Sequence, residues 1–70
     1  MKKEIVHNVV HDHRTDSDVT QQGLADAVGV SRQTIIAIER GNYVPSVALA
    51  LKISQYFDVS VEELFSLQYE

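Results

Sequence analysis

The stretch TQQGLADAVGVSRQTIIAIERG, residues 20–41, determines how this chain folds. The apolar residues of its first half follow the spacing of one helix face: Leu24, Ala25 and Val28. Gly29 follows them, at the point where a helix that ends in the left-handed conformation needs a residue without Cβ. Ser31 can cap a second helix, because its hydroxyl accepts a hydrogen bond from a free backbone N–H. The stretch therefore predicts two short helices joined by a tight turn.

The second of these helices, residues 31–40, has an apolar side and a polar side. Ile35, Ile38 and Glu39 fall on the first side, and the second side holds Arg32, Gln33, Ile36 and Arg40. Two helices joined by a short turn that contains glycine form the helix-turn-helix unit, whose second helix enters the major groove of DNA. Arg and Gln can each form paired hydrogen bonds with base edges. The pattern therefore predicts a helix-turn-helix over residues 20–40 that reads DNA.

The overall charge does not by itself favour DNA binding. Six Lys and Arg residues face ten Asp and Glu residues, which gives a formal net charge of -4 and an isoelectric point near 5.2. Binding depends on local charge rather than on the total. Residues 20–41 hold two Arg, one Asp and one Glu, so this segment is neutral. We therefore expect few phosphate contacts and a weak dependence of DNA affinity on salt.

Length and composition limit the class of protein. Residues 1–70 are expected to form a single domain with a marginally sufficient core, so that packing against a second copy would add stability. The chain has no cysteine, which excludes a disulfide framework and a zinc knuckle. No apolar run is long enough to cross a bilayer and no signal-peptide pattern is present, so we expect a cytoplasmic protein without a membrane partner.

The residues around the helix-turn-helix predict three further helices. Before it, residues 3–6 are expected to be extended, and Asn8 can cap a helix over residues 9–14 that is followed by a polar loop. After it, Ser46 can cap a helix over residues 47–57. The last elements are a short helix that a capping box opens at Ser60 and that ends near Phe65, and a short strand over 66–70. The predicted class is all-α, with five helices and a small β element from the chain ends.

The helix over residues 47–57 is apolar on two sides. One stripe contains Ala50, Ile53 and Phe57, and the other contains Val47 and Leu51. Such a second stripe is more often part of the core of its own chain, but a helix that is apolar nearly all round needs partners nearly all round, and this chain is short. We therefore expect a homodimer, with these candidates for its interface: Val47, Leu51, Phe65 and Leu67.

These motifs resemble the Cro and phage-repressor type of helix-turn-helix regulators, also called the xenobiotic-response-element family. The resemblance covers about residues 8–65, and its most specific motifs are TQ (20–21), GVSRQTI (29–35), IERG (38–41) and YVPS (43–46). The chain looks most like the short dimeric repressors of the cytolysin-operon type, which add a small β-sheet after five helices. The resemblance implies a transcriptional repressor that binds double-stranded DNA at a palindromic operator as a homodimer.

Residues expected to contact DNA lie in the helix-turn-helix and in the loop after it: Gln21, Ser31, Arg32, Gln33, Ile36, Arg40, Asn42 and Tyr43. The resemblance implies that Gln21 touches phosphate and braces the reading helix, and that the loop at 42–43 grips phosphate. Ile36 stands where the family commonly has Ser or Asn, and it can offer only apolar contact, for instance to a thymine methyl group. The resemblance also implies an ion pair between Arg14 and Glu39.

Three histidines near the start, His7, His11 and His13, raise the question of a metal site or a pH switch. His7 and His11 share a helix face only if the helix begins before His7, and His13 points about half a turn away from His11. Two ligands do not complete a tetrahedral zinc site, so we expect neither a metal nor another cofactor.

Two other functions remain open at this point. The chain could be an antitoxin that regulates its own operon and neutralises a partner protein, or an interaction module that kept the fold and lost DNA binding. The acidic balance and Ile36 favour the second of these. We do not expect an enzyme, because the chain lacks a cysteine nucleophile, a Gly-rich phosphate loop and a His and carboxylate set in register. We also expect no small-molecule ligand.

Overall fold

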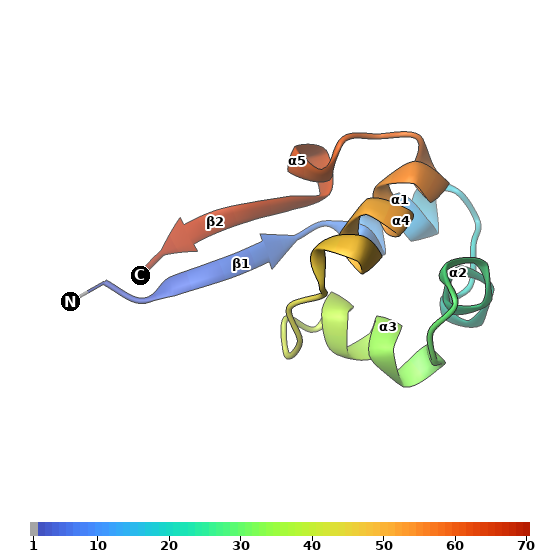
Figure 1. The fold of residues 1–70 in the computed structure, drawn as a ribbon, viewed down its shortest axis with the longest axis horizontal. Coiled ribbons are helices and arrows are strands. Elements are labelled where there is room, and N and C mark those ends of the chain that lie inside the picture. Colours follow the sequence, from blue (N-terminus) through green and yellow to red (C-terminus); the bar gives the residue numbers. More distant parts are fainter. Residues whose placement is uncertain (1) are drawn as a thin grey trace.

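The computed structural model describes residues 2–70 and contains five helices and two strands (Figure 1). In chain order they are β1 (Glu4–Asn8), α1 (Val10–Asp16), α2 (Gln21–Val28), α3 (Arg32–Glu39), α4 (Val47–Phe57), α5 (Val61–Leu64) and β2 (Phe65–Tyr69). The two strands pair antiparallel, with Glu4 opposite Tyr69 and Asn8 opposite Phe65. They form a ribbon that projects from the helices and carries the C-terminus at its far end (Figure 1).

The five predicted helices and the β element from the chain ends are confirmed, but the class is not strictly all-α. The extended segment predicted over residues 3–6 is confirmed from Glu4 on, and the strand continues to Asn8, because residues 4–8 all pair with β2. Phe65, predicted to end the last helix, begins β2 instead. The helix predicted over 9–14 runs from Val10 to Asp16 and so takes up part of the expected loop.

Asn8 was predicted to cap α1, but it lies one residue before the capping position. Val9 occupies the capping position of α1 and makes no side-chain capping bond. The Asn8 Oδ1 atom accepts a hydrogen bond from the backbone N–H of Val10 at 3.2 Å, and its Nδ2 atom donates to the carbonyl oxygen of Ile38 at 2.9 Å. Asn8 therefore links the end of β1 to both α1 and α3.

The helix starts at Ser31, Ser46 and Ser60 are confirmed. Each hydroxyl accepts a hydrogen bond from the backbone N–H three residues on, at 3.2, 3.1 and 3.3 Å respectively. Thr20 caps α2 in the same way, at 2.9 Å. These caps satisfy backbone donors that the first turn of a helix leaves free.

Two helices end in a left-handed residue, Gly29 after α2 and Asp58 after α4, with φ of 78° and 55°. We expect Gly29→Ala to lower the free energy of unfolding by about 1–2 kcal/mol, because a Cβ disfavours this conformation even though it would meet no atom within 4 Å. Asp58→Gly should raise it by about 0.5–1 kcal/mol for the same reason. Urea unfolding of both variants measures these changes. A Gly29→Ala protein with the same free energy of unfolding as wild type would contradict the first expectation.

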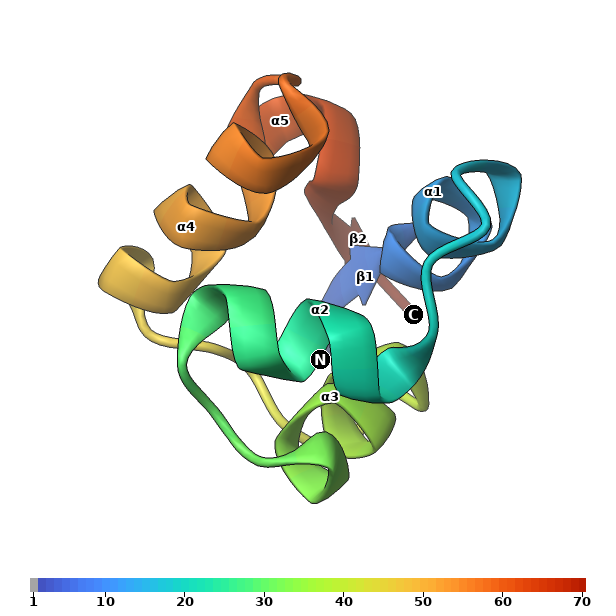
Figure 2. The same ribbon diagram turned by 90° about the vertical axis from the view of Figure 1, so that its right-hand side faces the viewer.

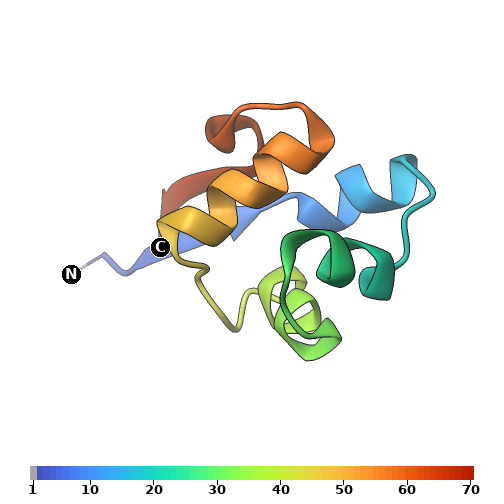
Figure 3. The same ribbon diagram turned by 45° about the vertical axis from the view of Figure 1, so that its right-hand side comes forward.

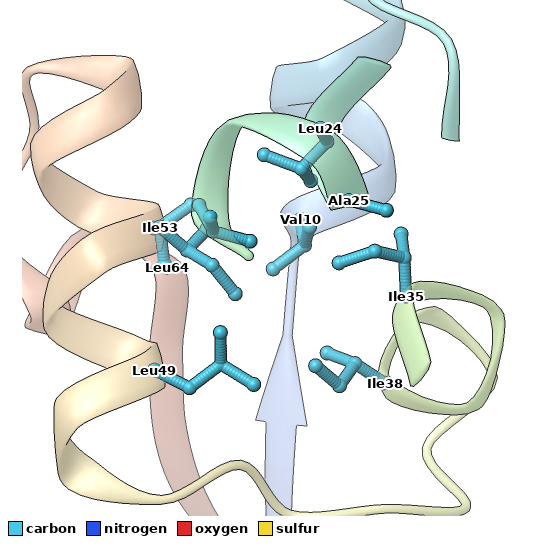
Figure 4. Packing of buried hydrophobic residues seen from close by; sticks show 9 residues of the cluster. Val10, Leu24, Ala25, Ile35, Ile38, Leu49, Ile53 and Leu64 are labelled. Carbon is cyan, nitrogen blue, oxygen red and sulfur yellow. The ribbon is translucent and has the colours of Figure 1, made fainter. Parts of the chain in front are cut away.

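The core lies between the helices, which surround it in Figure 2, and all five contribute to it (Figure 4). Its buried apolar residues are Val10, Leu24, Ala25, Val28, Ile35, Ile38, Leu49, Ile53 and Leu64. The inward faces predicted for α2 and α3 are confirmed. In α4 the inward face is centred on Leu49 and Ile53, whereas Ala50 and Phe57 of the predicted stripe are only half-buried. Among the described residues, no helix combines the length and the apolar character that crossing a membrane requires.

Candidate functional site

Helix α3 lies at the lower edge of the domain, with α2 packed against it (Figures 1 and 3). Ile35 and Ile38 are fully buried and so fix which side of α3 faces outward. Arg32 and Gln33, in the first turn of the helix, are exposed. The first turn of α3 therefore presents a cation and an amide on the outer surface.

The residues predicted to contact DNA divide into two groups by exposure. The exposed ones are Ser31, Arg32, Gln33, Arg40, Asn42 and Tyr43, and the half-buried ones are Gln21 and Ile36. A hollow of about 430 Å³ brings Gln21 and Arg32 together at the start of α2, where Arg14 and Thr20 also line it. The hydroxyl of Ser31 is already engaged, since it accepts from the N–H of Thr34 and lies 3.0 Å from the Thr34 Oγ1 atom.

An ion pair between Arg14 and Glu39 lies directly behind this surface. The Nε atom of Arg14 donates to Oε2 of Glu39 at 2.7 Å, and its Nη2 atom donates to Oε1 at 3.2 Å. The Nη1 atom of Arg14 donates to the carbonyl oxygen of Val19 at 2.9 Å. Only 11% of the Arg14 side chain and 5% of the Glu39 side chain are exposed. The pair therefore joins α1 to α3 and to the loop before α2.

Gln21 belongs to the same network, since its Nε2 atom donates to Oε1 of Glu39 at 3.2 Å. Burial by itself raises the pKa of the Glu39 carboxyl, but hydrogen bonds from Arg14 and Gln21 and the charge of Arg14 outweigh it, so that the pKa lies below its usual value. The Glu39 carboxylate is therefore ionised at neutral pH and orients the amide of Gln21. The resemblance gave Gln21 a bracing role, and the structure identifies Glu39 as its partner.

The three histidines lie in different surroundings. His7 is exposed on β1, and the ring of His13 packs against Phe57 with the centroids 5.9 Å apart. His11 lies against the ion pair, with its Nδ1 atom 3.4 Å from Oε1 of Glu39 and 3.1 Å from Nη2 of Arg14. Within residues 2–70, no group of three or more His, Asp or Glu side chains is arranged to hold a metal ion. The contact of His11 with Glu39 was missed because helical spacing relates a residue only to its neighbours along the chain.

Comparison with known proteins gives consistent matches. The helix-turn-helix family profile matches residues 11–64. An uncharacterised HTH-type transcriptional regulator of Methanocaldococcus jannaschii is 53% identical over 53 residues, covering 76% of this chain and 80% of that protein. The uncharacterised HTH-type transcriptional regulator YgzD of Bacillus subtilis is 46% identical over 63 residues, covering 90% and 96%. The CTXphi phage transcriptional repressor RstR of Vibrio cholerae is 30% identical over 57 residues, covering 81% of this chain and 51% of the repressor.

Two solved structures share the fold. The restriction-modification controller protein C.AhdI of Aeromonas hydrophila superposes with a TM-score of 0.72 at 28% identity, over 77% of this chain and 82% of that one. A protein from Bacteroides fragilis superposes with a TM-score of 0.80 over 89% of this chain and 100% of that one. Its identity is 21%, so this second match shows the fold alone.

Proposed function

The chain belongs to the helix-turn-helix family of DNA-binding transcriptional regulators, and from this premise we propose that it is a sequence-specific repressor that binds a palindromic operator as a homodimer. The observation that carries the proposal is the first turn of α3, which exposes Arg32 and Gln33 while Ile35 and Ile38 hold the helix in place. Such side chains at the start of a recognition helix are placed to reach base edges in the major groove. The match to a phage repressor supports repression as the sign of regulation.

Local charge supports DNA binding despite the net charge of -4. The carboxylate of Glu39 is turned inward and paired with Arg14, so it does not face the groove. Arg32 and Arg40 remain exposed at the two ends of α3. Affinity for DNA depends on the charge near the phosphates. Because Glu39 is paired inward, the α3 surface is positive, although residues 20–41 are neutral by composition.

The homodimer is supported by large apolar side chains that the single chain leaves exposed. They lie on the loop before α4, on α4 and on β2: Tyr43, Val44, Val47, Leu51, Tyr56, Leu67 and Tyr69. Val47 is 77% exposed and Leu67 is 56% exposed. Val47 and Leu51 lie one helical turn apart on α4, and exposed apolar side chains that gather on one face mark sites of association. A second copy would cover those on α4 and β2, and a two-fold axis would set the two α3 helices about 34 Å apart, matching half-sites about 10 base pairs apart.

The four residues predicted for the dimer interface differ in their exposure. Val47, Leu51 and Leu67 are exposed and available. Phe65 is half-buried and packs against the core of its own chain, so it would support the interface rather than form its centre.

We expect selection from random duplex DNA to enrich a palindrome with the wild-type protein. An Arg32→Ala, Gln33→Ala variant should lose or alter that enrichment, since each base contact is worth about 1–3 kcal/mol. The matched control is Lys52→Ala, Gln55→Ala, which removes the same two kinds of side chain from exposed positions on α4 and should select the wild-type sequence. If wild type enriches nothing across a range of salt, the interaction-module function replaces this one. An enriched palindrome together with a copurifying partner protein would favour the antitoxin function.

A further inference from the structure

His11 lies outside the proposed DNA surface, yet its ring contacts the network that holds Gln21. Its side chain is 60% exposed, so protons reach it freely from solvent. Its Nδ1 atom lies 3.1 Å from Nη2 of Arg14 and 3.4 Å from Oε1 of Glu39. Whether Nδ1 donates or accepts a hydrogen bond depends on whether it carries a proton.

The Oε1 atom of Glu39 is a crowded acceptor. Nη2 of Arg14 and Nε2 of Gln21 both lie 3.2 Å from it, and Nδ1 of His11 lies 3.4 Å from it. A carboxylate oxygen offers about two lone-pair sites. When His11 is neutral and Nδ1 is unprotonated, Nδ1 accepts from Arg14, and the two sites of Oε1 accept from Arg14 and Gln21. Each donor that faces the carboxylate then has an acceptor, and the 3.4 Å contact between Nδ1 and Oε1 joins two acceptors and is not a hydrogen bond.

Protonation of His11 creates a conflict in this network. The protonated Nδ1 becomes a donor, so it can no longer accept from Arg14, and its nearest acceptor is Oε1 of Glu39. Three donors then compete for about two sites. Hydrogen bonds from cations to a carboxylate are about twice as strong as those from neutral donors. Gln21 is the neutral donor, and it is therefore the one displaced.

We propose that His11 is a positioning residue that makes the orientation of Gln21, and through it the binding of DNA, respond to protonation of the His11 ring. Neutral His11 leaves the amide of Gln21 held by Glu39, and protonated His11 releases it. The effect on DNA rests on the proposed function, in which Gln21 contacts phosphate.

Other charged groups surround this network and set the controls. Arg14 on α1 and Glu39 on α3 face His11 directly. His7 on β1 and Arg40 after α3 line a hollow that also includes Glu39, and Asp12 follows His11 in the chain. His7 is the neighbouring group with the same kind of side chain, so His7→Gln is the matched control.

The first test uses the free protein and needs no DNA. We expect the side-chain amide resonance of Gln21 in a ¹H–¹⁵N spectrum to shift between pH 8 and pH 5 with the same midpoint as the ring of His11. The shift should persist in His7→Gln and disappear in His11→Gln. A Gln21 resonance that does not follow His11 would overturn the proposal.

The second test measures affinity for the duplex that selection enriches. Between pH 7.5 and 5.5 the DNA affinity of the wild-type protein should fall about threefold to tenfold relative to that of His11→Gln. This fold-change corresponds to the loss of one hydrogen bond. In a Gln21→Ala background this difference should vanish. A His11-dependent change that persists without Gln21 would mean that the ring acts on the DNA charge directly, against the proposal. If the protein binds no DNA, the proposed function fails, and the resonance of Gln21 alone decides the role of His11.

Discussion

Replacing Glu39 with alanine is expected to lower the free energy of unfolding by about 3–5 kcal/mol, the usual cost of breaking a buried ion pair. The substitution leaves the guanidinium of Arg14 in a site where only 11% of its side chain is exposed, with the carbonyl of Val19 and the ring of His11 as its remaining partners. It also removes the acceptor of the Gln21 amide. Both α1 and the start of α2 would lose the polar contacts that Glu39 makes with them.

Urea unfolding of Glu39→Ala measures this loss. The control Glu62→Ala removes an exposed carboxylate from α5 and should change stability by no more than about 0.5 kcal/mol. An Arg14→Met, Glu39→Met double variant should recover much of the loss, because the cost of Glu39→Ala comes from an uncompensated buried charge. Wild-type stability in Glu39→Ala would show that the pair contributes nothing.

The same carboxylate gives stability a defined pH dependence. Because the pKa of Glu39 is lower in the folded protein than its usual value, the ionised form contributes stability that is fully present above the unfolded pKa, about 4.3. That contribution is lost as the pH falls through the folded pKa. The wild-type protein should therefore lose more stability than Glu39→Ala when the pH is lowered below about 4.

The second large effect expected is the loss of operator binding when the exposed stripe of α4 is charged. Val47→Glu, Leu51→Glu places two carboxylates at positions that are 77% and 45% exposed in the single chain, where folding tolerates them. In the proposed homodimer these carboxylates would be buried near their copies in the partner, and association would fail. A monomer reaches one half-site only, and losing about half of a typical specific binding free energy reduces affinity at least about a thousandfold.

Sedimentation and fluorescence anisotropy with the selected duplex test this prediction together. The matched control is Lys52→Glu, which changes the net charge by the same amount at another exposed position of α4. The control should remain dimeric and keep most of its affinity, and any loss it shows measures the effect of charge alone. A double variant that still sediments as a dimer would place the interface elsewhere.

The sequence by itself determined the features that depend on neighbouring residues. Gly29, Ser31 and Ser46 mark helix boundaries because their capping bonds reach only three or four residues along the chain. Leu24 and Ile35 could be assigned to the core because a helix repeats its faces at a known spacing. These features depend on residues close together in the sequence, so the sequence alone predicts them.

Tertiary structure alone decided the features that depend on distant residues. Leu49 rather than Ala50 centres the inward face of α4, because the neighbouring helices set how α4 is rotated. β1 extends to Asn8 because β2 pairs with it from the other end of the chain. The ion pair of Glu39 with Arg14 was implied by the family resemblance, but the contacts of Glu39 with Gln21 and His11, which span 18 and 28 residues, were not predicted. No local pattern reports which distant donors meet at one carboxylate, because folding brings them together only when the helices pack.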